Sequence, residues 1–142
     1  MWIAGEWTDA EDGSTSDVLN PATGEVIATT PKATITDVER CVAASRADLK
    51  SKEWAAMDPA QRGRILQKMA AATYANAKSL AAVESTNNGK TFREALSEIR
   101  YGAWTLEYFA GLSDKIEGST IPVPGSRLNY TLKQPLGCLL YT

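Results

Sequence analysis

The chain has 142 residues, which is enough for one domain. Of these residues, 44% are apolar and 23% are charged. This ordinary globular composition excludes the low-complexity and disordered classes. The net charge is −2, from 15 basic and 17 acidic residues that are interspersed along the chain. This distribution argues against a nucleic-acid partner. No apolar run reaches the roughly 18 residues of a membrane span, so no membrane partner is expected.

Strands are predicted over the first thirty residues. Residues 2–7 contain two tryptophans and an isoleucine, and Asp12-Gly13 is a strong turn signal. A second turn is predicted at 20–24, where a proline presets φ and a glycine permits a positive φ. Residues 25–30 then form another strand. Together these signals predict a three-stranded β-meander with one covered face.

Two helices are predicted next. Thr36 and Glu39 have the spacing of a capping box, and an apolar stripe continues from there to about Trp54. Asp58-Pro59 opens the second helix, with aspartate as the cap and proline at the first helical position. The predicted buried face of this second helix consists of Ile65, Leu66, Met69 and Ala72.

The helical pattern continues in two further segments. One ends at Gly89, where a left-handed C-cap is expected, so Asn87-Asn88-Gly89-Lys90 is interpreted as a helix end. The other begins at Thr91 and extends to about Gly118. Its apolar stripe consists of Ala95, Ile99, Ala103, Leu106 and Phe109/Ala110.

Extended structure is predicted for the remaining residues. Two prolines exclude a helix at 121–125, and alternation over 128–133 indicates a half-buried strand. The continuous apolar run at 136–141 suits a strand covered on both faces, as in a parallel sheet. No crossover helix or parallel neighbour follows it, so the fold is expected to be interrupted.

Few residues are candidates for chemistry. Histidine is absent, which excludes Ser-His and Cys-His nucleophiles, and no phosphate-binding loop or metal-spaced cluster occurs. Cys41 lies on an apolar helical stripe and Cys138 in the apolar run, so both are interpreted as structural. Without a CxxC pair or a secretory signal, these thiols indicate a reducing, cytoplasmic location.

The remaining polar and aromatic side chains have simple structural interpretations. The carboxylates of Glu84, Glu94, Glu98 and Glu107 are expected on solvated helix surfaces. Trp104, Tyr108 and Phe109 are expected to mark a helix buried on two sides, in a core or a subunit contact.

Five motifs in this order resemble the N-terminal part of the aldehyde dehydrogenase superfamily. They are IAGEW at 3–7, NPATGEVIA at 20–28, NGK at 88–90, LEYFAGL at 106–112 and YTLKQPLG at 130–137. The third and fourth are most similar to the betaine and amino-aldehyde dehydrogenases.

The resemblance implies an α/β fold, of which this chain holds an α+β part. This part would comprise the N-terminal β-meander and the helices of the family's dinucleotide-binding domain. That domain would be truncated in this chain at its first parallel strand. Residues 1–118 would be the N-terminal part of the NAD(P)-binding domain, and 119–134 the start of an oligomerisation arm. Residues 135–142 would be the incomplete first strand of the dinucleotide-binding sheet.

The resemblance also implies oxidation of an aldehyde to a carboxylic acid with NAD or NADP. A cysteine thiolate attacks the aldehyde, hydride passes to the cofactor, and a glutamate-activated water hydrolyses the thioester, with an oxyanion stabilised by hydrogen bonds. These groups would follow this chain, since the family's Pro-Trp-Asn segment is replaced here by Leu139-Leu140-Tyr141-Thr142. We therefore predict no catalytic and no cofactor-binding residue, and no cofactor for the chain alone.

The same resemblance implies a monovalent cation site. Many family members hold K⁺ or Na⁺ through main-chain carbonyls, and the matching positions are Val18, Leu19 and Asn87. The family often has aspartate at the last of these positions.

The predicted function is therefore that of part of an aldehyde dehydrogenase, which acts on an aldehyde as a homo-oligomer but is inactive as this chain alone. The alternative is a non-catalytic, self-associating structural or binding module that covers its open sheet edge and apolar end with a partner. A helical scaffold without a ligand is a third interpretation.

Overall fold

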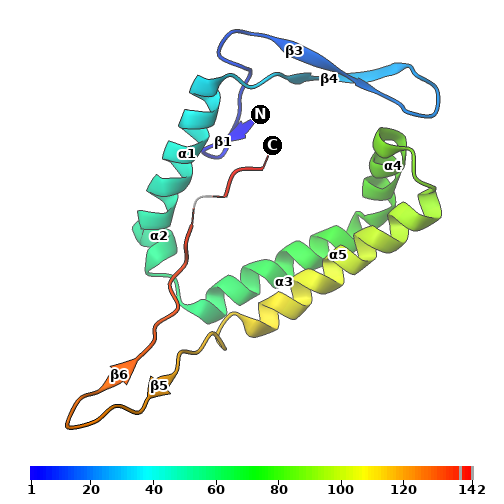
Figure 1. Ribbon diagram of the computed structural model, residues 1–142. Coiled ribbons are helices and arrows are strands. Elements are labelled where there is room, and N and C mark those ends of the chain that lie inside the picture. Colours follow the sequence, from blue (N-terminus) through cyan, green and yellow to red (C-terminus); the bar gives the residue numbers. More distant parts are fainter. Residues whose placement is uncertain (138, 142) are drawn as a thin grey trace.

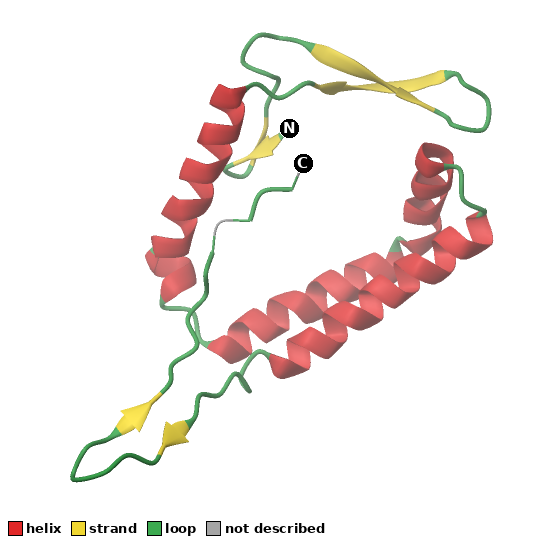
Figure 2. Cartoon of the chain, viewed as in Figure 1, coloured by secondary structure: helices red, strands yellow, loops and turns green. Residues whose placement is uncertain are grey.

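The helices and short strands of the chain enclose an open ring in the computed structural model, which describes residues 1–137 and 139–141 (Figure 1). The first helix forms one side, a long β-hairpin forms the next, and three further helices close the other two sides. A second hairpin projects outward from one corner (Figure 2). The prediction of mixed helices and strands is confirmed.

The strands pair as three separate antiparallel hairpins. β1 (Trp2–Ile3) pairs with β2 (Glu6–Trp7), β3 (Thr15–Leu19) with β4 (Val26–Pro31), and β5 (Thr120–Ile121) with β6 (Asn129–Tyr130). Ala4 and Gly5, at φ 52° and 84°, form the tight turn between the first two strands. The two predicted turns are also present, with Gly13 at φ 70° and Gly24 at φ 74°.

The predicted three-stranded meander is wrong, because β2 does not pair with β3. The segment between them instead docks on the start of the first helix. Ala10 is buried, and the N–H of Glu11 donates to Oδ2 of Asp37 over 3.1 Å. This anchor directs the chain away from β2, and β3 pairs only with β4.

The N-cap of the first helix, α1 (Ile35–Lys50), lies two residues before the predicted cap. Thr34 is the N-cap, and it exchanges hydrogen bonds with Asp37: Asp37 N–H donates to Thr34 Oγ1, and Thr34 N–H donates to Asp37 Oδ2. The predicted pair of Thr36 and Glu39 has the same spacing. Asp37 determines the start because its buried carboxylate also accepts from the preceding loop.

The other helices follow with few interruptions. They are α2 (Lys52–Ala55), α3 (Pro59–Ala75), α4 (Ala77–Asn88) and α5 (Phe92–Leu112). The predicted caps are confirmed: Asp58 Oδ1 accepts from the N–H of Ala60 over 2.7 Å, and Thr91 Oγ1 accepts from the N–H of Glu94. α5 ends at Leu112 instead of Gly118.

Helices α3 and α5 lie side by side and make the most extensive contact in the structure. The buried residues of the two helices are small, namely Gly63 and Ala70 on α3 and Ala95, Ala103 and Ala110 on α5. A Cβ at Gly63 would lie 2.7 Å from the carbonyl oxygen of Ala110. The predicted stripe on α5 is thus largely confirmed.

The predicted buried face of α3 is wrong. Ile65, Met69 and Ala72 are exposed, and Leu66 is half-buried. Since only small side chains permit this close helix approach, the face with glycine and alanine is buried and the larger residues point elsewhere.

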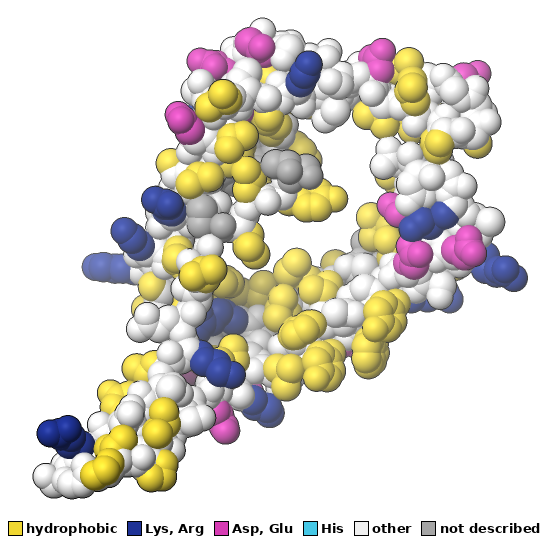
Figure 3. All heavy atoms as spheres, viewed as in Figure 1, with side chains coloured by type: hydrophobic (Ala, Val, Ile, Leu, Met, Phe, Trp, Pro, Cys, Tyr) yellow, Lys and Arg dark blue, Asp and Glu magenta, His cyan; other side chains and the backbone are white. Residues whose placement is uncertain are grey.

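The ring leaves most large apolar side chains uncovered. The buried apolar residues in the described part of the chain are Ile3 and seven alanines. A compact monomer of this mass exposes about 7,100 Å² of surface, whereas this chain exposes 11097 Å². Apolar side chains gather along the inner side of the ring and over the α3–α5 pair (Figure 3).

The apolar run near the C-terminus lies extended beside α1 (Figure 1). Its described residues, 136, 137 and 139–141, have no strand partner within the described chain. Leu136 is 99% and Tyr141 100% exposed. Cys138 lies outside the described residues. The assignment of this run to a parallel sheet stays a prediction.

Acid is expected to loosen the junction at Asp37. The N–H groups of Thr34 and Glu11 hold the pKa of the Asp37 carboxyl below its ordinary value. Its contribution to folding is therefore complete above the unfolded pKa of about 4 and is lost as the pH falls through the lowered folded value. Asp37→Asn should lower the urea midpoint at neutral pH and flatten the acid dependence of helix content by circular dichroism. Asp17→Asn, on exposed β3, is the control, and identical acid profiles for the Asp37 variant and the parent chain would contradict this assignment.

Candidate functional site

The three predicted cation ligands lie on two segments that meet at one corner of the ring. Val18 and Leu19 end β3, and Asn87 lies in the last turn of α4. Pro21, just after β3, lies close to Gly89, just after α4. A Cβ at Gly89 would lie 2.9 Å from Cγ of Pro21. This contact brings the β3–β4 turn to the end of α4 (Figure 1).

The two segments differ in how their main-chain groups are paired. The register of the β3–β4 pairing shifts between Val18 and Leu19, where Ile27 of β4 has no partner residue, and both predicted ligand positions are paired with β4. Asn87 is among the last four residues of α4, whose carbonyls lack partners within the helix. The negative end of the helix dipole also favours a cation. Neutral oxygens of this kind suit a monovalent cation, and the site at Val18, Leu19 and Asn87 stays a prediction.

The end of α4 is fixed by Gly89 and its neighbours. Gly89, at φ 81°, forms the predicted left-handed C-cap, and its N–H donates to the carbonyl of Ser85 over 2.9 Å. Ser85 Oγ donates to the carbonyl of Lys90 over 2.6 Å. The interpretation of residues 87–90 as a helix end is confirmed.

A charged cluster joins α4 to α5 at the same corner. The ammonium of Lys90 lies 3.1 Å from Glu84 Oε1 and also pairs with Glu98 Oε2. The carboxylates of Glu98 and Glu84 raise the pKa of Lys90 above its ordinary value. Sequence spacing predicts only solvated carboxylates here, because eight residues separate Lys90 from Glu98 across a helix boundary and no helical periodicity relates them.

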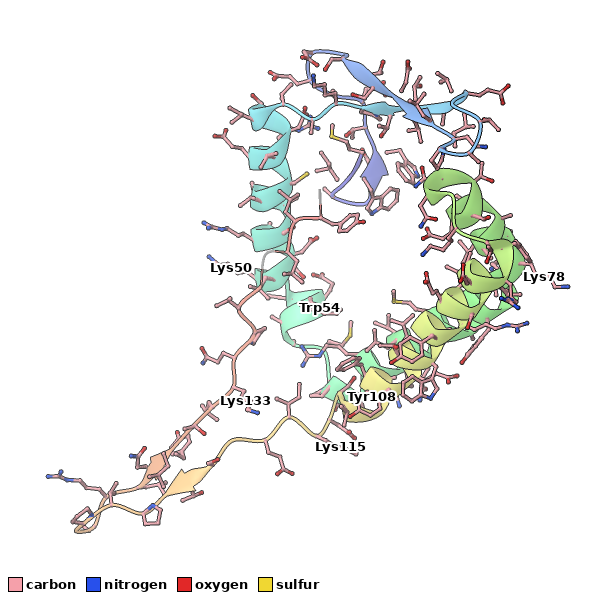
Figure 4. All side chains as sticks on the ribbon, turned by 45° about the vertical axis from the view of Figure 1, so that its right-hand side comes forward. Lys50, Trp54, Lys78, Tyr108, Lys115 and Lys133 are labelled. Atoms are coloured by element: carbon pink, nitrogen blue, oxygen red, sulfur yellow. The ribbon has the colours of Figure 1, made fainter. Side chains whose placement is uncertain are left out.

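The aromatic residues of α5 form an uncovered ladder. Ring centroids lie 5.4 Å apart for Tyr101 and Trp104, and 6.0 Å apart for Trp104 and Tyr108. Tyr108 also meets Phe109 edge to face. Trp104, Tyr108 and Phe109 are 50–55% exposed, so their predicted burial in a core is wrong for this chain. A contact with another polypeptide stays a prediction. Figure 4 labels Tyr108 on α5 and Trp54 on α2.

A hollow of about 740 Å³ lies between β1, α1 and residues 139–141. Ile3, Val38 and Cys41 contribute apolar walls, and Asp37 and Asp48 contribute carboxylates. Asp37 is already engaged by four donors, from Glu11, Thr34 and Arg40. Cys41 is a half-buried free thiol on the predicted helical stripe.

The described residues show no cluster of side chains arranged for metal binding or for nucleophilic catalysis with histidine. Among residues 1–137 and 139–141, no three acidic or sulfur side chains gather to hold a metal ion, and the chain lacks histidine. None of the helices described is long and apolar enough to span a membrane.

Comparison with known proteins gives consistent matches. The sequence pattern of the aldehyde dehydrogenase family matches residues 7–141. The human mitochondrial 10-formyltetrahydrofolate dehydrogenase is 38% identical over 96% of this chain. The chain spans only 15% of that protein's length.

Solved structures give the same result. An aldehyde dehydrogenase from Bacillus cereus superposes with a TM-score of 0.87 at 36% identity, over 92% of this chain and 27% of that one. Betaine aldehyde dehydrogenase from Staphylococcus aureus, solved in complex with NAD⁺, superposes with a TM-score of 0.83 at 33% identity. That match covers 88% of this chain and 26% of the other.

Substitution of Gly89 should open the corner where the two segments meet. Gly89→Ala adds the strain of a positive φ, about 1–2 kcal/mol, and a clash with Pro21. In Pro21→Ala, which removes Cγ, the same glycine substitution should cost less. Urea unfolding of both single variants and the double variant measures this coupling. Strict additivity would show that Pro21 and Gly89 do not touch.

Proposed function

The chain belongs to the aldehyde dehydrogenase family, and we propose that it supplies the N-terminal part of an NAD(P)-dependent enzyme that oxidises an aldehyde to a carboxylic acid. The observation that carries this proposal is the match over residues 7–141, in register with a superposition at a TM-score of 0.87. The NAD⁺ bound to the S. aureus relative supports a nicotinamide cofactor for the complete enzyme.

The exposed surface supports a role as part of a larger unit. The chain exposes far more area than a compact monomer of its mass, and much of the excess comes from large side chains. Leu139, Trp104 and Tyr108 are each at least half exposed. Large exposed apolar side chains in such number indicate interaction sites. We infer that the dinucleotide-binding sheet of the complete enzyme covers it, with residues 135–142 as its first strand.

The chain alone is expected to be inactive, since the family's catalytic cysteine and glutamate are not within it. Incubated with NAD⁺ and betaine aldehyde, it should give no increase in NADH absorbance above a protein-free blank. The S. aureus betaine aldehyde dehydrogenase serves as the positive control. A rate proportional to the concentration of this chain, and retained on further purification, would contradict the assignment.

Residues 119–134 are proposed to begin an arm that joins subunits of a homo-oligomer. The β5–β6 hairpin projects from the ring, and its edges are free to extend a sheet (Figure 2). Tyr130 and Leu128 are 56% and 76% exposed on it. A cytoplasmic location is part of the same proposal, supported by the free thiol of Cys41.

The carbonyls of Val18, Leu19 and Asn87 are proposed to hold K⁺ or Na⁺. The negative end of the α4 dipole and the Pro21–Gly89 contact support this site. KCl should raise the melting temperature more than choline chloride at equal ionic strength, and Asn87→Asp should increase the difference by adding a charged ligand. Equal effects of the two salts on parent and variant would exclude the site.

The alternative function, a self-associating module without catalysis, is favoured by the same exposed apolar surface. Size-exclusion chromatography with light scattering separates the two proposals. A single dimer or tetramer at all concentrations favours the module, and heterogeneous aggregates favour a part that lacks its covering polypeptide. Trp104→Ser with Tyr108→Ser should reduce such aggregation, because these rings form an exposed apolar ladder.

A further inference from the structure

Asn88 differs from the other asparagines of the chain in its C-terminal neighbour. The chain has five asparagines, and only Asn88 precedes a glycine. Glycine has no side chain to hinder attack by its own nitrogen on the preceding residue. Asn88 and Gly89 are both exposed to water at the end of α4.

We propose that Asn88 is a site of spontaneous deamidation, and that opening of the last turn of α4 controls its rate. The main-chain nitrogen of Gly89 loses its proton and bonds to Cγ of Asn88. The Cγ–Nδ2 bond breaks, and the side-chain nitrogen leaves as ammonia. Water then opens the resulting succinimide at either carbonyl, giving aspartate or isoaspartate. Water is the only co-reactant, and no atom changes its oxidation state.

Three hydrogen bonds restrain the reacting atoms in the closed structure. The attacking nitrogen, Gly89 N, donates its proton to the carbonyl of Ser85 over 2.9 Å. The leaving group, Asn88 Nδ2, donates to Glu84 Oε1 over 2.6 Å. The side-chain oxygen of Asn88 accepts from the N–H of Lys90 over 2.9 Å. The first two bonds hold the attacking nitrogen and the leaving group and must break before Cγ and the nitrogen can meet, so the reaction proceeds from a locally opened state.

The product would keep the corner open. A carboxylate at position 88 replaces a donor to Glu84 with a second negative charge, and it lies at the negative end of the α4 dipole. Isoaspartate also lengthens the main chain by one atom directly before Gly89. Gly89 then cannot hold its position against Pro21, the contact that joins α4 to the β3–β4 turn. Deamidation would therefore act as an irreversible release of this corner.

Peptide mapping by mass spectrometry tests the proposal on the whole chain in neutral buffer. A synthetic peptide covering residues 83–94 gives the unrestrained rate. Asn88 in the folded chain should react about tenfold more slowly than in the peptide, and faster than the four other asparagines. Glu84→Ala should accelerate the reaction about threefold, because it frees the leaving group. Glu107→Ala, at an exposed position on α5, is the matched control and should leave the rate unchanged.

Hydrogen exchange at the Gly89 amide, measured on the same samples, reports the opening directly. Across parent and variants, the deamidation rate should rise in proportion to this exchange. The proposal is overturned if chain and peptide react at the same rate, if another asparagine reacts first, or if Glu84→Ala changes exchange but not deamidation. A general loss of structure in Glu84→Ala would accelerate exchange at every helical amide. Local opening of the last turn of α4 would accelerate exchange at Gly89 and leave the other helical amides as they are in Glu107→Ala.

Discussion

The close contact between α3 and α5 is the constraint on which the rest of the structure depends. The fully buried residues of the two helices are glycine and alanine, and the backbones approach until a single added methyl at Gly63 would strike the carbonyl of Ala110. Such faces pack tightly, but each buried alanine removes little apolar area from water. The helix pair therefore has a fixed geometry but buries little apolar surface. Its large side chains remain exposed in this structure.

Those large side chains explain the open ring. Apolar groups lie along the inner side of the ring and over the α3–α5 pair, and they remain in water because no element of the described chain fills the opening (Figure 3). The similar enzymes hold the same arrangement of elements within chains of which this one spans 26–27%. The ring keeps its form through local contacts, which are the helix caps, the hairpins and the helix pair.

Local polar contacts fix the two ends of the arrangement. At one side, the buried carboxylate of Asp37 accepts from Glu11 and so joins the segment after β2 to the start of α1, where Thr34 and Arg40 also donate to it. At the opposite corner, Lys90 is held between Glu84 and Glu98 while Gly89 rests against Pro21. Each junction joins segments distant in sequence with few atoms. Substitution there should change the relation between elements more than the elements themselves.

The sequence alone determined the local elements, because caps and turns depend on neighbours only a few residues away. Asp58-Pro59, Thr91 and Gly89 marked helix ends correctly, and Gly13 and Gly24 marked turns, since each residue type has its own backbone preference. The five motifs also identified the family. Only the tertiary structure decided between Thr34 and Thr36 as the cap, because the choice depends on a bond from Glu11. It also selected glycine and alanine as the buried face of α3, since both faces of that helix carry apolar residues and only the small ones permit contact with α5.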